Sequence, residues 1–189
     1  MKRAAVLVLL SVAFVACRTA RPTGAPLAPL TSASAEEAAM QLREQRPSFT
    51  NVRSLMRVRA TTNGKTQSFR AQLAVHDAQR MELVAYTPVG TTALTLKANG
   101  NQVATDPEVA PESFAFLRAA GLTPAETAML LLGMPPRDDV PVTLAATGIA
   151  SASAGELTVT FDPPSFPAKR VIITRGADRV EIEHLEVVR

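Results

Sequence analysis

The feature that most restricts the fold of this sequence is a regular alternation of apolar and polar residues, interrupted by turn residues. Residues 56–61 alternate in this way, and Asn63 and Gly64 follow them. Asn-Gly between two alternating segments is the strongest short-range signal for a β-hairpin. The alternation resumes over 69–75, so we expect two antiparallel strands with one apolar face and one polar face.

The same pattern continues on both sides of a central region. Further alternating segments, separated by turn residues, lie at 81–85, 94–98, 102–105, 157–161, 171–173 and 180–183. The first five strands follow one another through short turns, which predicts an antiparallel meander that is wet on one face. The full pattern predicts about eight strands.

Helix signals lie before the first strand and between the two groups of strands. Ser34 and Glu37 have the spacing of a capping box, which predicts a helix over 35–46 that ends at Pro47. A short helix is possible over 111–120. Thr123 and the glutamate three residues later repeat the capping box before an apolar run at 128–132. That helix is apolar nearly all round, which fits either a core helix or a lid over a ligand. We therefore predict an α+β fold, with a curved antiparallel sheet wrapped on a helical plug.

The N-terminus has the organisation of a secretory signal. Lys2 and Arg3 precede an apolar run over 4–16 that only Ser11 interrupts. The run is too short to span a bilayer comfortably, because a spanning helix needs about 20 residues. We expect residues 1–16 to be a signal peptide, and the alternative is a buried helix or a short anchor.

Cys17 closes this segment. The stretch from Phe14 to Cys17 reads Phe-Val-Ala-Cys and resembles a bacterial lipobox, in which the cysteine is acylated and becomes the new N-terminus. The alternative is an unmodified cysteine in an ordinary signal peptide. Arg18 follows instead of an aspartate, which favours the outer membrane. Residues 17–33 are rich in Pro, Ala, Ser and Thr and predict a lipidated tether, so the folded domain is expected over 34–189.

Composition excludes several classes of function. The formal net charge is +3, and removal of Lys2 and Arg3 leaves 18 Lys and Arg against 17 Asp and Glu, which does not suggest a nucleic-acid-binding surface. A single cysteine excludes an internal disulfide framework and a cysteine-based zinc cluster. His76 and His184 stand apart from other metal-ligating residues, and no catalytic motif occurs. We expect no metal, no cofactor and no enzyme activity, although a triad of scattered residues could still support an enzyme acting on envelope lipid or glycan.

The apolar side of the predicted sheet is the more informative feature. Aromatic residues make up only 4% of the chain, so aliphatic and Met side chains would line an interior that adapts to variable chains. The residues expected to line an acyl-chain cavity are Met56, Val58, Phe69, Leu73, Met81, Leu83, Leu94, Leu96, Met129, Leu130, Leu132, Val159, Phe161 and Ile182. The alternative is that the same residues fill one another's space.

The stretch 86–98, YTPVGTTALTLKA, resembles the outer-membrane lipoprotein receptor family LolB, which has a Pro-Leu-Gly turn before a similar strand. The order of elements over 35–189 is also similar. The resemblance implies an incomplete barrel, covered by helices, that binds lipoprotein acyl chains and delivers lipoproteins to the outer membrane. It implies a LolA-like periplasmic carrier as partner, and a monomer is expected.

The resemblance also assigns the turn. Pro88, Val89 and Gly90 match the membrane-delivery turn of the LolB family, and Val89 would project from it in place of leucine. The alternative is that Val89 folds back onto the sheet. The tryptophan that is common near the first strand of that family is missing here. A second function stays open, that of an envelope lipoprotein with a filled barrel that serves as an assembly accessory.

Overall fold

A computed structural model describes residues 21–108 and 120–189. In this part of the chain, ten antiparallel strands form one sheet in the order β5-β4-β3-β2-β1-β10-β9-β8-β7-β6. The first five strands are β1 Val52–Thr62, β2 Lys65–Val75, β3 Arg80–Tyr86, β4 Thr92–Asn99 and β5 Gln102–Asp106. The last five are β6 Val142–Ala145, β7 Gly148–Ala154, β8 Leu157–Phe161, β9 Arg170–Arg175 and β10 Asp178–Val188. The described sheet has β5 and β6 as its two edges, so it is an incomplete barrel, as predicted.

The predicted meander β1–β5 is confirmed. Thr62 pairs with Lys65, and the two residues between them, Asn63 and Gly64, have φ angles of 51° and 73°. Two left-handed residues in a two-residue loop make a type I′ turn, whose twist matches that of the flanking strands. The Asn-Gly signal therefore set both the position of the hairpin and its register.

The count of about eight strands is too low, because β6 and β7 were missed. β7 reads GIASASA, with Ile149 as its one β-branched residue, and β6 reads VTLA, which is too short to show an alternation. Both form because β8 offers β7 an edge and β7 in turn pairs with β6. Long-range pairing between β1 and β10 then joins the two halves of the sheet.

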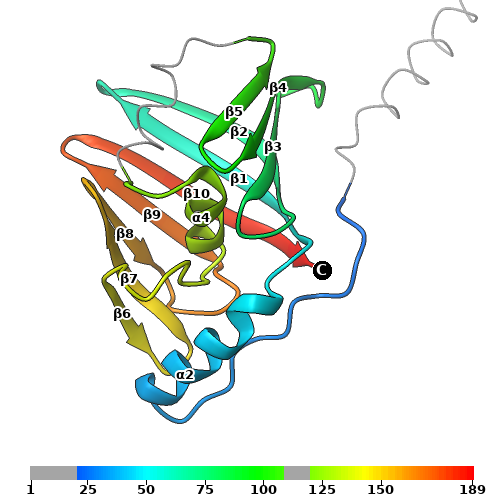
Figure 1. The fold of residues 1–189 in the computed structure, drawn as a ribbon. Coiled ribbons are helices and arrows are strands. Elements are labelled where there is room, and N and C mark those ends of the chain that lie inside the picture. The colour runs from blue at the N-terminus through cyan, green and yellow to red at the C-terminus, as the bar shows by residue number, and fades with distance from the viewer. Residues whose placement is uncertain (1–20, 109–119) are drawn as a thin grey trace, which may run out of the picture.

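Two α-helices within the described ranges lie against this sheet. Figure 1 shows α4, Pro124–Leu131, within the curve of the sheet, and α2, Ala35–Gln45, beside β6. α4 contacts β2, β3 and β4, whereas α2 contacts β6. Buried side chains from the inner face of the sheet and from both helices form a single apolar cluster. The helical plug predicted from the sequence is therefore α4.

The first predicted helix is nearly correct at both ends. The Ser34 side chain accepts a hydrogen bond from the Glu37 amide, as a capping box requires. The Glu37 carboxylate, however, accepts from the Ala33 amide (2.7 Å) and not from that of Ser34. The helix ends at Gln45, and a 3₁₀ turn, Arg46–Ser48, carries Pro47. The possible helix over 111–120 falls almost wholly outside the described residues.

The chain before α2 follows the end of β10. Ala25 and Arg189 exchange two backbone hydrogen bonds, and the Leu30 amide donates to the Phe166 carbonyl. Leu30 is buried in the apolar cluster. Contacts with the domain thus begin before the boundary expected at residue 34. The predicted signal peptide and Cys17 lie outside the described residues, and none of the helices described is long and apolar enough to cross a bilayer.

Candidate functional site

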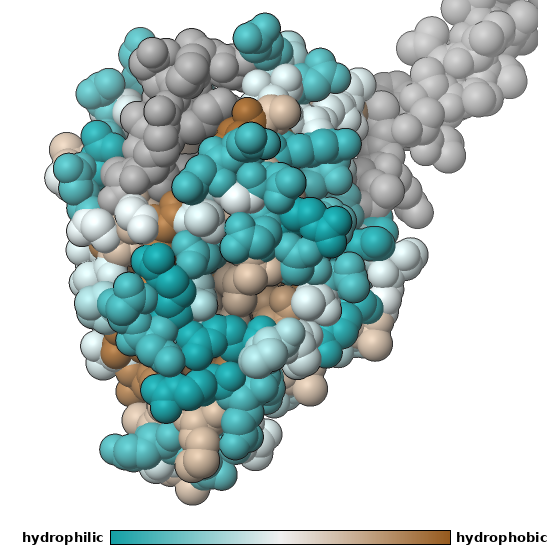
Figure 2. Space-filling model, in the orientation of Figure 1, coloured by the Kyte–Doolittle hydropathy of each residue, from teal (hydrophilic) through white to brown (hydrophobic). Residues whose placement is uncertain are grey.

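The residues expected to line a cavity come together on the inner side of the sheet. Phe69 and Leu83 are partly buried against the apolar cluster, and Leu94 is half-buried. The others are buried members of the cluster: Met56, Val58, Leu73, Met81, Leu96, Met129, Leu130, Leu132, Val159, Phe161 and Ile182. In Figure 2 the face turned to the viewer is mostly hydrophilic, with apolar surface in separate patches. The common location is as expected, while contact of these residues with a ligand stays a prediction.

Both ends of α4 are closed by specific caps. At its N-terminus, Thr123 and Glu126 form the reciprocal capping box expected from the sequence. At its C-terminus, Gly133 has φ +90°, and the amides of Gly133 and Met134 donate to the carbonyls of Leu130 and Met129. This pattern is a Schellman motif, in which glycine adopts the left-handed conformation at low cost. The short helix therefore has defined ends.

The two carbonyls that the Schellman motif leaves free bind α4 to the other half of the sheet. The Leu132 carbonyl accepts from the Ala168 amide (3.0 Å). The Leu131 carbonyl accepts from Nε2 of His184 (3.0 Å), a residue of β10. Nδ1 of His184 lies 2.7 Å from Oγ of Ser54, a buried residue on the inner side of β1. His184 thus joins α4, β10 and β1.

The partners of His184 define its protonation. A carbonyl can only accept, so Nε2 carries the proton and Nδ1 accepts from the Ser54 hydroxyl. Burial lowers the pKa of His184 from 6.5 to about 4, although the hydrogen bond to Leu131 acts in the opposite direction. The ring is therefore neutral at pH 7. Both nitrogens are occupied by protein groups, which gives His184 a structural role as a helix C-terminal partner.

The sequence did not predict this arrangement. The sequence offers His184 only as a weak candidate metal ligand and shows no role for Ser54. The available signal was the place of Ser54 on the apolar side of an alternating strand, since a buried hydroxyl requires a partner. His76 instead lines a surface groove of about 570 Å³ with Arg80 and Glu82. The described residues contain no group of three or more His, Cys, Asp or Glu side chains suited to a metal ion.

The turn between β3 and β4 is compact and presents an apolar tip. The Thr87 amide donates to the Thr91 carbonyl (2.8 Å), the Gly90 amide donates to the Thr87 carbonyl (2.9 Å), and the two threonine hydroxyls lie 2.8 Å apart. Gly90 has φ +88°. Val89 is 65% exposed, so it does not fold back onto the sheet. An exposed aliphatic side chain on a well-braced turn is available for contact with lipid or a partner.

Comparison with known proteins places the chain in a family. Residues 53–186 match the family model described as "Protein of unknown function (DUF3261)". The chain belongs to this family. No curated protein matches it.

Two solved structures have a fold similar to that of this chain. One is a LolA superfamily protein, NE2245, from Nitrosomonas europaea, with 8% sequence identity, a TM-score of 0.50, and coverage of 84% of this chain and 94% of the other. The second is a putative outer membrane lipoprotein-sorting protein domain from Vibrio parahaemolyticus, also at 8% identity and TM-score 0.50, with coverage of 80% and 90%. The fold implied by the LolB resemblance, a curved sheet that does not close with helices against it, is thus shared with both solved structures.

Proposed function

We propose that this protein binds the acyl chains of lipoproteins against the inner face of its sheet and delivers lipoproteins to the outer membrane. The observation that carries the proposal is the exposed Val89 on a braced turn of a curved sheet with an apolar interior. The similarity in fold to the LolA superfamily protein of Nitrosomonas and to the putative lipoprotein-sorting domain of Vibrio supports it. In this proposal Cys17 is the lipidated first residue of the mature chain.

The proposed function requires no covalent chemistry. Acyl chains pass from one apolar site to another when each successive site binds them more tightly. A LolA-like periplasmic carrier would bind them least tightly, this protein more tightly, and the bilayer most tightly. The interior contains aliphatic and Met side chains, which can adapt to chains of different shape. The protein would act as a receptor and not as an enzyme.

A second candidate is an envelope lipoprotein that supports the assembly of another complex. The observation in its favour is that the inner residues already pack into one continuous cluster, as a filled interior would. The two candidates differ in bound lipid: the receptor retains acyl chains after purification, whereas the accessory does not.

Depletion of the protein in its own bacterium tests the receptor function in the cell. We expect lipoproteins to accumulate in the periplasm or the inner membrane, because their transfer to the outer membrane would stop. Membrane fractionation followed by immunoblotting of several lipoproteins measures this. Correct sorting under depletion would contradict the proposal.

Val89→Glu tests the role of the turn. We expect delivery to vesicles to slow at least about tenfold, because an ionised carboxylate enters an apolar bilayer far less readily than valine. Acyl-chain binding should be unchanged, since Val89 is outside the buried cluster. The matched control is Val103→Glu in β5, where Val103 is 40% exposed. Equal delivery by Val89→Glu and the native protein would make the assignment of the turn wrong.

Cys17→Ala tests the anchor. We expect the variant to be released from the membrane in carbonate washes, because several acyl chains are needed for firm anchoring and none would remain. Retention of the variant as an integral membrane protein would instead support the short-anchor interpretation of residues 4–16.

A further inference from the structure

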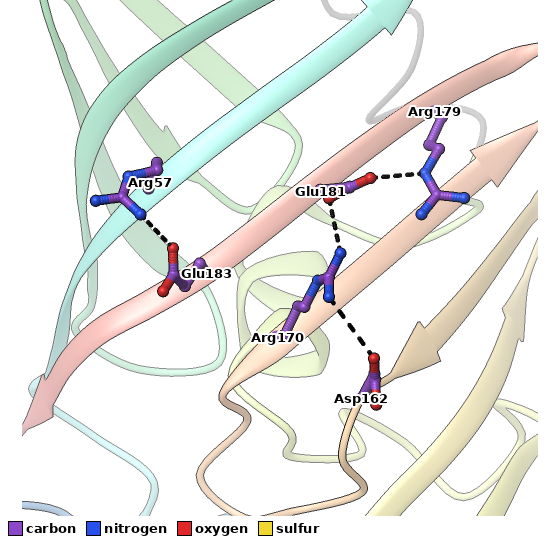
Figure 3. A network of polar contacts seen from close by, with 6 residues as sticks. All are labelled: Arg57, Asp162, Arg170, Arg179, Glu181 and Glu183. Carbon is purple, nitrogen blue, oxygen red and sulfur yellow. Dashed lines mark hydrogen bonds and ion pairs between the residues drawn. The ribbon is translucent and has the colours of Figure 1, made fainter.

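The outer face of the sheet carries a network of ion pairs that Figure 3 shows across β1, β10 and β9. Arg57 Nη1 donates to Glu183 Oε2 (2.7 Å). Glu181 accepts from both Arg170 (3.0 Å) and Arg179 (2.9 Å). The hydrogen bond from Arg170 is the main reason why the pKa of Glu181 is lowered. The Glu181 and Glu183 carboxylates therefore already form hydrogen bonds with the guanidinium groups of three arginines.

More cations occupy this face than the network can neutralise. Arg53, Arg59, Arg70 and Lys169 are exposed, and no side-chain hydrogen bond or ion pair within the described residues involves them. Arg59 lies opposite Glu181 in the register of β1 and β10, yet that carboxylate holds two other arginines. A positive surplus is therefore built into the outer face.

The neighbouring strand adds to the surplus. Arg70 lies directly opposite Arg57 in the β1–β2 register. Like charges in directly opposed positions disfavour the pairing of two strands. The fold therefore tolerates an unfavourable arrangement here, although replacement of either arginine by a neutral residue would relieve it. An anionic ligand would also relieve it.

The surplus is continuous with the base of the Val89 turn. Arg70 pairs with Tyr86, the last residue of β3, and the turn follows immediately. The Tyr86 hydroxyl donates to Gln72 Oε1 (3.2 Å). At this end of β2 and β3, the apolar Val89 tip is thus followed by Tyr86 and then by the arginines Arg70 and Arg57 on the next two strands.

We propose that the basic face binds anionic phospholipid headgroups and orients the domain on a membrane. The basic face consists of Arg53, Arg57, Arg59, Arg70, Lys169 and Arg170. Surface association of this kind combines a buried apolar group with attraction of basic residues to anionic lipid. Val89 supplies the apolar group, and the basic face supplies the attraction. The proposal rests on the function proposed for Val89 but not on acyl-chain binding.

Charge and position favour a membrane over an acidic protein as the occupant. Stable protein interfaces centre on buried aromatic or aliphatic anchors. The groove on this face, of about 620 Å³, is lined mainly by charged side chains, among them Arg57, Arg59, Lys169, Glu181 and Glu183. A headgroup layer needs no apolar anchor within the groove, because its negative charges are spread over a surface.

Vesicle sedimentation with residues 21–189 tests the proposal, since the sheet, both α-helices and the apolar cluster lie within that range. Vesicles contain phosphatidylcholine alone or with phosphatidylglycerol. We expect binding to the anionic vesicles only. This binding should be lost in 0.5 M salt, because the distance over which charges interact falls to about 4 Å. Inorganic phosphate at matched ionic strength should not compete.

The decisive variant is Arg59→Gln/Arg70→Gln. Each basic residue near an anionic surface contributes about a fivefold factor in binding, so the double variant should bind about thirtyfold more weakly. Its fold should persist, because neither side chain is hydrogen-bonded to any residue that the structure describes and the change relieves the repulsion at Arg57. Circular dichroism and thermal unfolding check this. The control, Arg43→Gln/Arg175→Gln, removes the same number of positive charges from α2 and from the end of β9, where the two arginines pair with Asp138 and Glu156.

The outcomes separate this proposal from the receptor function. Equal binding to both vesicle types, or an equal loss in the control variant, overturns the membrane-binding role of the basic face and leaves an acidic protein as its occupant. Acyl-chain binding is measured in parallel by native mass spectrometry. If the protein carries no acyl chain yet shows the expected vesicle binding, the receptor function is wrong and the membrane-binding role of the basic face is supported.

Discussion

His184 shows how a single buried polar residue connects elements that are distant in sequence. Its ring links the last residue of α4 to Ser54 of β1 through one donated and one accepted hydrogen bond. Most of the other contacts of α4 with the sheet are apolar and non-directional, so this pair of hydrogen bonds fixes the orientation of the helix. The role of His184 is therefore one of position and not of reaction.

Replacement of His184 by leucine should be strongly destabilising. The Leu131 carbonyl would lose its His184 donor, and the Ser54 hydroxyl would keep only a long hydrogen bond (3.5 Å) to the Leu55 carbonyl. We expect a cost of about 2–3 kcal/mol in the free energy of unfolding. Urea unfolding at pH 7.5 measures this loss. His76→Leu is the control, and we expect it to change stability by less than about 0.5 kcal/mol. A similar loss in both variants would contradict the assigned role of His184.

Stability should also depend on pH through His184. Its pKa is about 4 in the folded protein and 6.5 as the ordinary value, so between these limits the unfolded chain binds the proton and the folded chain does not. The contribution of neutral His184 to the free energy of unfolding is fully present above pH 6.5. It decreases as the pH falls towards 4, by about 3 kcal/mol in total.

The measurement is the free energy of unfolding in urea across this pH range at constant ionic strength. His184→Gln should remove most of the slope, because glutamine can donate to the Leu131 carbonyl but does not titrate. Carboxyl groups with lowered pKa values, such as those of Asp77 and Asp138, affect the pH dependence of stability below the range of pH 4 to 6.5. A slope that persists in His184→Gln would show that other groups cause it.

At the scale of elements, the stability of α4 depends more on the caps at its two ends than on its length. Eight residues are too few for a stable isolated helix. The capping box, the Schellman motif and the hydrogen bonds to Ala168 and His184 provide the stability that so short a helix lacks on its own. The sequence predicted the first of these, because capping boxes are local. It did not predict the last, because they depend on residues that only the fold brings near.

Two glycines that flank α4 allow a controlled test. Gly121 has φ +64° and nothing within 4 Å of an added Cβ, whereas at Gly133 an added Cβ would lie 3.1 Å from the Ala168 nitrogen and 3.2 Å from the Ser165 carbonyl oxygen. Gly121→Ala should cost about 1 kcal/mol, the usual penalty for a left-handed alanine. Gly133→Ala should cost at least about 1 kcal/mol more, because the neighbouring backbone must move. Thermal unfolding of both variants compares them, and equal losses would mean that the contact at Ala168 is not tight.

Strands show the same division between local and long-range information. The Asn63-Gly64 hairpin and the alternation in β1–β4 were readable, since each depends on neighbours in sequence. β6 and β7 were not readable, because short Ala- and Ser-containing segments become strands only when an edge is present. In the candidate site, the inner apolar residues were predicted from the alternation, and Val89 from the resemblance of its turn to that of the LolB family. The surplus of arginines on the outer face depends on the register of β1, β2 and β10, which only the fold sets.

At the scale of the whole molecule, the segment before α2 belongs to the folded unit. Residues 25–27 pair with the end of β10, the Leu30 amide donates to the Phe166 carbonyl, and the Leu30 side chain is buried. A chain that begins at residue 34 should therefore be less stable than one that begins at residue 21. Loss of the buried leucine alone costs about 2 kcal/mol, and the lost strand pairing adds to it. Urea unfolding of the two chains measures the difference, and equal midpoints would show that the segment is only a tether.

The two faces of the sheet suit two different ligands. The inner face is apolar and carries α4, whereas the outer face is charged and has a surplus of cations next to the Val89 turn. In the proposed receptor, acyl chains would contact the first face while headgroups contact the second. In that proposal, the division would give one domain both a place for a lipoprotein and a direction towards the membrane.

Native mass spectrometry of residues 21–189, produced in a bacterial periplasm, tests the central claim most directly. If the inner face binds acyl chains, the protein will carry bound lipid or lipoprotein and release it on collisional activation. An added fluorescent fatty acid will then bind with one-to-one stoichiometry and be displaced by triacylated peptide. A protein that shows only its own mass and binds neither probe would contradict the receptor function and favour the filled-barrel accessory.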